Sequence, residues 1–107
     1  MAESSIVRHV VVFRYRDSAT AAQIVEVTAA FAALRHAIPG IRSFEHGVNN
    51  SAEGKNLGFT HVYMLTFDDI AARDAYLPHP AHQAFGALLG RLGALDDAFV
   101  VDYEPAA

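Results

Sequence analysis

The chain has 107 residues, 52% of them hydrophobic, with a formal net charge of -4, eight scattered basic residues and no cysteine. This composition indicates a single packed domain over residues 1–107; it excludes disulfide frameworks and thiolate metal sites, and it disfavours nucleic acid as a partner. No apolar run approaches the roughly 20 residues that span a bilayer, and the N-terminal segment lacks a signal-peptide pattern. We therefore expect a cytoplasmic protein without a membrane partner.

The first half of the chain predicts a strand, a helix and a second strand. Residues 6–16 alternate between two faces, and both faces carry apolar side chains at their centre, which is typical of a strand covered on both sides. Residues 20–37 carry apolar side chains at helical spacing and begin with the capping-box pair Thr20 and Gln23. Residues 41–48 predict the second strand.

The second half predicts two more strands around a broken helix. Residues 59–67 alternate between two faces and are rich in aromatic and β-branched side chains, which indicates a strand that begins at Phe59. Helical segments follow over residues 70–77 and 80–92, and residues 98–103 predict the last strand.

The order β-α-β-β-α-β predicts an α+β fold: a ferredoxin-like protomer with a four-stranded antiparallel sheet and its helices on one face. The other face would then expose apolar side chains such as Val10 and Val12. An exposed apolar sheet face normally marks an interface. We therefore expect a homodimer through the sheet face, with two-fold symmetry and a shared barrel-like core, that is, a dimeric α/β barrel.

The most informative motif is the proline break between the two helical segments. Pro80 fits the first position of a helix, which makes His79 the expected cap and places His82 in the first turn. The positive end of the helix dipole disfavours a protonated imidazole there, so we expect His82 to be neutral and basic.

Four polar side chains are expected to meet on the helix-covered face of the sheet. His9 and His61 belong to the central neighbouring strands, and Tyr76 and His82 flank the helix break, so the sequence predicts a pocket with three imidazoles and one phenol. The predicted substrate-binding residues are His9, His61, Val11, Phe13, Tyr63 and Phe85.

His82 and Tyr76 are the candidate catalytic residues. His82 would act as a general base on a proton next to a carbonyl, and Tyr76 would orient it or stabilise the enolate oxygen. The alternative is structural: His82 satisfies backbone groups or fills space, Tyr76 is a core aromatic, and His9 with His61 holds the sheet to the helices.

No metal or cofactor site is predicted. His79 and His82 have i, i+3 spacing, but no carboxylate lies at an obvious completing position. The paired acids are expected to lie in turns and at helix starts. These are Asp68-Asp69 and Asp96-Asp97.

Six short motifs together resemble the stress-responsive dimeric α/β-barrel (Dabb) domain family, over essentially the whole chain. They are residues 6–16 with His9-Val10, Ile38-Pro39-Gly40-Ile41, Gly58-Phe59-Thr60-His61, Ala72-Arg73-Asp74-Ala75-Tyr76, His79-Pro80-Ala81-His82 and Val101-Asp102-Tyr103-Glu104-Pro105. The resemblance implies a ferredoxin-like protomer that pairs through its sheets.

The family includes stress proteins of undefined chemistry and olivetolic acid cyclase-like polyketide cyclases, which close a linear polyketide by intramolecular aldol condensation without a cofactor. The resemblance implies cyclase roles for Tyr76 and His82 and pocket positions for His9 and His61. The sequence departs from the cyclases in having no tryptophan and in the Gly- and Leu-rich stretch 86–95. We therefore expect a stress-response domain that binds a small apolar molecule in a His/Tyr-lined pocket, with a cyclase-like enzyme as the alternative.

Overall fold

A four-stranded antiparallel sheet forms one layer of the computed structural model, which describes residues 5–107. The strands lie in the order β2-β3-β1-β4. Their bounds are Val7–Tyr15 for β1, Ile41–Val48 for β2, His61–Phe67 for β3 and Leu95–Tyr103 for β4. Residues 1–4, on which part of the signal-peptide prediction rests, lie outside the described residues.

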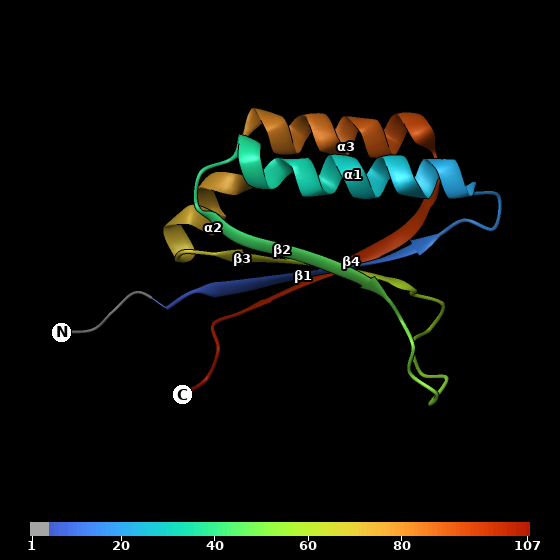
Figure 1. Ribbon diagram of the computed structural model, residues 1–107, viewed down its shortest axis with the longest axis horizontal. Helices are drawn as coiled ribbons and strands as arrows, with labels where there is room; N and C mark the ends of the chain where they lie inside the picture. Colours follow the sequence, from blue (N-terminus) through green and yellow to red (C-terminus); the bar gives the residue numbers. More distant parts are fainter. Residues whose placement is uncertain (1–4) are drawn as a thin grey trace.

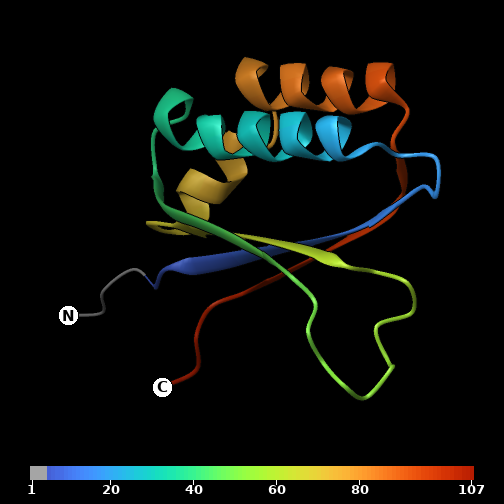
Figure 2. The same cartoon turned by 45° about the vertical axis from the view of Figure 1, so that its right-hand side comes forward.

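Three helices form the second layer: α1 (Ala21–Ala37), α2 (Ile70–Tyr76) and α3 (Pro80–Leu92). Figure 1 shows α1 and α3 side by side over one face of the sheet, with α2 near one end of the sheet, and Figure 2 shows the same two layers after a turn. This arrangement, with the second helix broken into α2 and α3, confirms the predicted α+β ferredoxin-like fold. None of the helices within residues 5–107 is long and apolar enough to cross a membrane.

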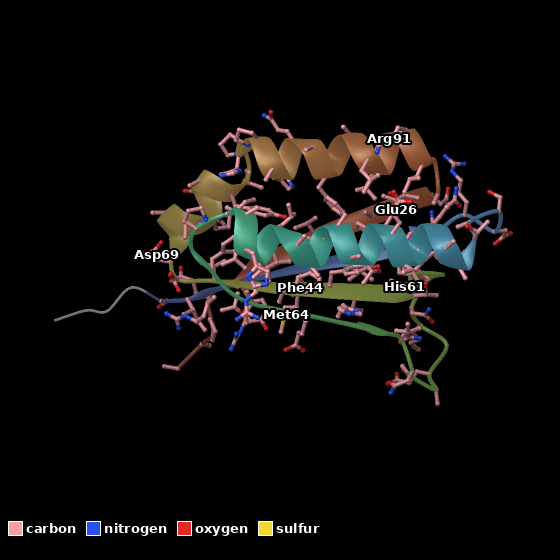
Figure 3. The ribbon with its side chains drawn as sticks, turned by 45° about the horizontal axis from the view of Figure 1, so that its top comes forward. Glu26, Phe44, His61, Met64, Asp69 and Arg91 are labelled. Atoms are coloured by element: carbon pink, nitrogen blue, oxygen red, sulfur yellow. The ribbon has the colours of Figure 1, made fainter. Side chains whose placement is uncertain are left out.

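The helices begin at the residues whose side chains cap them. Thr20 and Gln23 exchange the two hydrogen bonds of the predicted capping box at the start of α1. Asp69 caps α2, and Figure 3 shows it at the start of that helix. His79 caps α3, and Pro80 is the first residue of the helix, as predicted.

The core lies between the sheet and the two long helices. Phe31 of α1 is central to it, because its ring centroid lies 4.5 Å from that of Phe85 on α3 and 5.0 Å from that of Tyr63 on β3. These aromatic contacts hold both helices against the sheet. The other buried hydrophobic residues of the core cluster are Val7, Val11, Phe13, Val27, Leu34, Ile38, Ile41, Leu65, Phe67 and Tyr76.

The turn between α1 and β2 requires glycine at one position. Gly40 has a φ of 90°, and a Cβ added there would lie only 2.6 Å from the Cβ of Ala72 on α2. Glycine therefore serves two purposes here, since it accepts the left-handed backbone and lets α2 approach the turn.

Strand β3 is shorter than predicted. It begins at His61 rather than at Phe59, because the preceding residues form a turn in which the Phe59 N–H donates to the Asn56 carbonyl. Phe59 therefore does not share a face with His61. Its ring packs instead 4.9 Å from that of Phe99 and beneath the guanidinium of Arg14.

Strand β4 is longer than predicted, and the sequence-based role of two acids at its start was wrong. The strand begins at Leu95 rather than at residue 98, and Asp96 and Asp97 lie within it. Arg14 of β1 stabilises this extension, because its side chain contacts Asp96 at 2.8 Å and Asp97 at 3.5 Å. The two acids are thus strand residues paired across the sheet rather than turn or helix-start residues.

The face of the sheet without helices carries two apolar rows, which we call the outer face. One row runs across three strands through Met64, Val10 and Val101. The second row consists of Val62, Val12 and Phe99. Val101 and Phe99 are 52% and 45% exposed, so the rows are open to solvent in the protomer.

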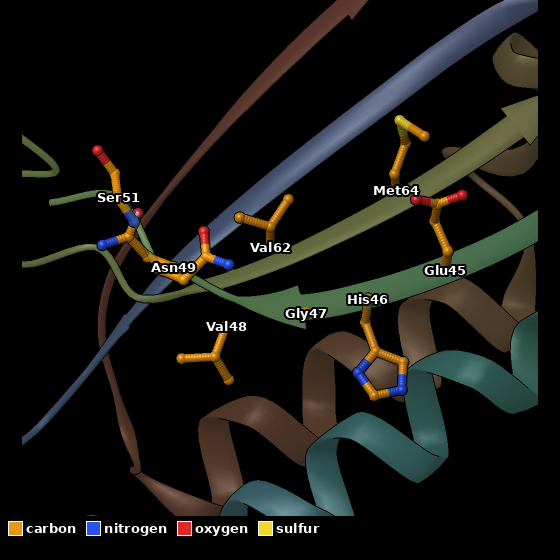
Figure 4. A pocket seen from close by; sticks show the side chains of 9 residues that line it. Glu45, His46, Gly47, Val48, Asn49, Ser51, Val62 and Met64 are labelled. Atoms are coloured by element: carbon orange, nitrogen blue, oxygen red, sulfur yellow. Dashed lines mark hydrogen bonds between the residues drawn. The ribbon is translucent and has the colours of Figure 1, made fainter.

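A hollow of about 390 Å³ lies beside these rows, at the β2–β3 end of the outer face. Figure 4 shows Val62 and Met64 on one side of the sheet and His46 on the other, toward the helices. Val62 and Met64 belong to both the rows and the hollow, so the apolar rows of the outer face end in a depression.

Candidate functional site

A pocket of about 370 Å³ opens between α3 and the half of the sheet formed by β1 and β4. Six of the eight predicted site residues line it: His9, Val11, Phe13, Tyr76, His82 and Phe85. The remaining lining residues are Phe31, Leu77, Gly86, Leu89, Leu95, Ala98 and Val100. The pocket therefore has apolar walls and a small set of polar groups, as small-molecule sites commonly do.

The three polar side chains of the pocket form a row. The ring centroid of Tyr76 lies 5.5 Å from that of His9 and 4.3 Å from that of His82. His9 comes from β1, Tyr76 from the last turn of α2 and His82 from the first turn of α3. The helix break is what brings Tyr76 and His82 together, because it turns the chain between them.

Within residues 5–107, His82 makes its side-chain hydrogen bond through one ring nitrogen, Nδ1. Its Nδ1 lies 2.9 Å from the carbonyl oxygen of Leu77, which can only accept a hydrogen bond. In the neutral imidazole the proton must therefore be on Nδ1, and Nε2 keeps its lone pair. This geometry is the one that a general base requires.

His9 is part of a partly buried hydrogen-bonded network with Asp102 and Arg73, which the sequence did not predict. Its Nδ1 lies 2.6 Å from Oδ1 of Asp102 on β4, and Nη1 of Arg73 on α2 donates to Oδ2 of the same carboxylate at 2.8 Å. Burial lowers the pKa of His9 and outweighs the opposing effect of the Asp102 carboxylate. His9 is therefore neutral near pH 7.

Tyr76 is a protonated phenol in this site. Burial raises its pKa, and the nearby Asp102 carboxylate raises it further. Tyr76 is 1% exposed and lines the pocket. A protonated phenol can donate a hydrogen bond.

Two predicted site residues, His61 and Tyr63, do not line the pocket. His61 pairs with Phe13 across β1 and β3, whereas His9 pairs with Leu65, four positions along the strand. That offset separates the two histidines by about 13 Å, and Figure 3 shows His61 at the end of the sheet away from α2. The prediction that they lie close together was wrong, because a shared face does not fix their positions along the strands.

Tyr63 and His61 make polar contacts with residues that do not line the pocket. The Tyr63 hydroxyl lies 2.8 Å from those of both Tyr15 and Thr28, which links β1, β3 and α1. The His61 ring packs edge-on against Tyr15, with centroids 4.9 Å apart, and its Nδ1 bonds the Thr60 hydroxyl. These contacts are those of structural residues.

The spacing of His79 and His82 does not build a metal site. His79 Nδ1 accepts a hydrogen bond from the Ala81 N–H, which is its role as the α3 cap. Across residues 5–107, no group of three or more histidine, aspartate or glutamate side chains could hold a metal ion.

The lowered histidine pKa values lead to a testable pH dependence of stability. Burial lowers the pKa of both His9 and His61, so the unfolded chain binds these protons more readily than the folded protein. The unfolding free energy should therefore fall as the pH drops below about 6.5, the ordinary histidine value. Denaturant titrations between pH 7.5 and 5.5 should show this fall, and His9→Gln should flatten it. A wild-type stability that stays constant over this range would contradict it.

The family model of the stress-responsive A/B barrel domain, Dabb, matches residues 7–105. The chain belongs to the Dabb family. This finding confirms the resemblance inferred from the six sequence motifs.

Two relatives show what this Dabb chain is similar to. It is 33% identical over 101 residues to the stress-response A/B barrel domain-containing protein HS1 of Arabidopsis thaliana, which covers 94% of this chain and 91% of the relative. It is 28% identical over 99 residues to olivetolic acid cyclase of Cannabis sativa, with 92% of this chain and 96% of the cyclase covered.

A hydroxynitrile lyase from Passiflora edulis superimposes with a TM-score of 0.85 at 26% identity, covering 95% of this chain and 94% of the lyase. A protein from Jannaschia sp. CCS1, described as a dimeric ferredoxin-like protein of unknown function, gives 0.78 at 31% identity, with coverage of 94% and 99%. Structural neighbours of this Dabb chain are thus described as dimeric.

Proposed function

We propose that this Dabb domain is a cytoplasmic homodimer that binds a small apolar molecule with a carbonyl group at one end. The observation that carries the proposal is the uneven lining of the 370 Å³ pocket. The polar side chains His9, Tyr76 and His82 stand in a row, whereas the other lining side chains are apolar. Such a pocket favours a ligand with an apolar body and one polar end.

The homodimer is supported by the outer face and by the neighbours. Two solvent-exposed apolar rows lie where the sheet has no helices, and related structures are described as dimeric. Pairing two outer faces would remove these rows from water.

Gly86 offers the sharpest test of ligand binding. It lines the pocket, is exposed, and has open space where a Cβ would be. Glycine within a helix destabilises the fold by roughly 0.5–1 kcal/mol relative to alanine, so a substitution here need not reduce stability. We expect Gly86→Leu to fill the pocket and to weaken binding of an alkyl aryl ketone at least about tenfold, since the lost contact area is worth more than 1.4 kcal/mol. Binding can be measured by NMR titration.

Gly90→Leu is the matched control. Gly90 lies one turn further along α3, also has open space at its Cβ position, and does not line the pocket. Both variants should be as stable as the wild type or more so, because each replaces a helical glycine. Equal loss of binding in the two variants, or no loss in either, would contradict the assignment of this pocket as the ligand site.

Proton-transfer catalysis of the cyclase type is the second candidate function. It is favoured by the hydrogen bond that leaves Nε2 of His82 free. His82 would take a proton from the carbon next to a carbonyl, and the electron pair of the broken C–H bond would form an enolate. The Tyr76 hydroxyl would donate a hydrogen bond to the enolate oxygen. The enolate carbon would then bond to a second carbonyl carbon of the same molecule. The new alkoxide would recover the proton from His82, and loss of water would complete the condensation.

A further inference from the structure

The Arg73–Asp102–His9 network spans three elements and reaches the pocket only through His9. Arg73 is on α2, Asp102 on β4 and His9 on β1. His9 is 4% exposed, and it is one of the residues that line the pocket. The side chains of Asp102 and Arg73 are 21% and 23% exposed and line a separate hollow of about 220 Å³.

The two contacts of Asp102 fix the proton on His9. A carboxylate only accepts hydrogen bonds, so the 2.6 Å contact requires the proton of the neutral imidazole to be on Nδ1. Nε2 of His9 then carries a lone pair. Within residues 5–107 the ring is hydrogen-bonded through Nδ1, and His9 lines the pocket.

Arg73 keeps the carboxylate in this orientation. Its Nη1 holds the second oxygen of Asp102 at 2.8 Å, which leaves the first oxygen for His9. The ionisable groups around His9 are Asp102 of β4, Arg73 and Tyr76 of α2, and His82 of α3. Asp102 is the anion among them and directly contacts the ring.

We propose that Asp102, held by Arg73, is a positioning residue that fixes His9 as a hydrogen-bond acceptor at Nε2, and that the pocket therefore takes ligands with a hydroxyl or enol group at the His9 end. The Tyr76 hydroxyl can donate a hydrogen bond, and both histidines can accept one. A ligand carbonyl flanked by a hydroxyl or enol would therefore match these three side chains. This ligand class rests on the proposed small-molecule function of the pocket.

Asp102→Asn tests the positioning directly. The guanidinium of Arg73 can only donate, so the oxygen of the new amide must face Arg73 and its NH₂ must face Nδ1 of His9. His9 then has to accept at Nδ1, and its proton moves to Nε2. Nitrogen-15 NMR of the imidazole rings distinguishes the two tautomers, and it needs neither ligand nor activity.

Asp74→Asn is the matched control. Asp74 accepts from Nε of the same arginine at 2.8 Å, but its side chain is 63% exposed and it does not contact His9. We expect the Nδ1–H tautomer of His9 in the wild type and in Asp74→Asn, and the Nε2–H tautomer in Asp102→Asn. A wild-type spectrum with the proton on Nε2 would overturn the proposal even if Asp102→Asn failed to fold. An unchanged tautomer in a folded Asp102→Asn protein would overturn it as well.

A pair of isosteric probes tests the ligand class. The preference for the phenol is the dissociation constant of 4-propyltoluene divided by that of 4-propylphenol. We expect this ratio to be about fivefold larger in the wild type and in Asp74→Asn than in Asp102→Asn, which corresponds to the loss of one neutral hydrogen bond. An equal preference for the phenol in all three proteins would overturn the ligand class while leaving the pocket function intact. If neither probe bound the wild type, the pocket function and the ligand class would fail together, whereas the ring spectra would still decide the role of Asp102.

Discussion

His82→Gln is expected to lower kcat/KM for cyclisation of a linear polyketide thioester by about 10²–10⁴-fold if the pocket is catalytic, the usual contribution of a general base. Glutamine has a similar length but cannot take a proton from carbon at neutral pH. The loss should be mainly in kcat, because the apolar walls that bind the substrate remain unchanged. Product formation can be followed by chromatography under single-turnover conditions.

Matched variants separate a lost base from a damaged pocket. His36→Gln makes the same substitution at an exposed histidine of α1 and should retain wild-type turnover. Tyr76→Phe keeps the ring packing against His82 and removes only the hydroxyl, so it should also slow the reaction by weakening enolate stabilisation.

The outcomes of this experiment discriminate between the two proposed functions. Turnover by His82→Gln within twofold of an active wild type would show that another group takes the proton. A wild type that binds the ketone probe but converts no substrate would retire the catalytic candidate and leave a binding domain.

The arrangement of the elements could be predicted from the sequence because local signals agreed with one another. The capping pair Thr20 and Gln23 and the cap-and-proline pair His79 and Pro80 each mark a helix start by a hydrogen bond or a fixed φ that neighbouring residues determine. The alternating β1 residues likewise determined which side meets the helices. Such signals act over a few residues, which is why they can be read from one chain.

The composition of the site was only partly predictable, since it depends on the register between strands. Alternation correctly placed His9 and His61 on one face, but the offset that separates them is set by pairing across β1 and β3. Asp102 was missed for the same reason: it lies within the strand predicted over residues 98–103, but only the register between β1 and β4 places it opposite His9.

Gly86 was missed because glycine has no side chain to suggest a function. Its sequence context is simply that of a helix, where glycine is unfavourable. Only the position of the pocket shows that the missing side chain leaves space for a ligand.

Val101→Glu is expected to convert the homodimer into monomers at micromolar concentration. Val101 lies in an apolar row of the outer face, opposite Val10, and two-fold symmetry would place a buried carboxylate on each protomer. The effective cost is several kcal/mol per buried ion, so the dissociation constant should rise by at least about 10³-fold. Sedimentation velocity over a concentration series measures this directly.

Val25→Glu is the control for that substitution. Val25 is 68% exposed and lies on α1, in the helical layer on the other side of the sheet from the outer face, so the same change should leave the dimer intact. A dimeric Val101→Glu protein would place the interface elsewhere, and a monomeric wild type would remove the dimer altogether.

The monomer produced by Val101→Glu should also bind pocket ligands less tightly. Val101 lies between Val100, which lines the pocket, and Asp102, which contacts His9. Because successive strand residues point to opposite faces, β4 contributes to both the pocket and the outer face. Strand β4 is an edge strand of the sheet, and among the described residues 5–107 its one neighbouring strand is β1. Contacts across the outer face would therefore restrain the same strand that positions the pocket wall. A Val101→Glu monomer with wild-type ligand affinity would show that β1 and Arg73 hold β4 in place without the partner.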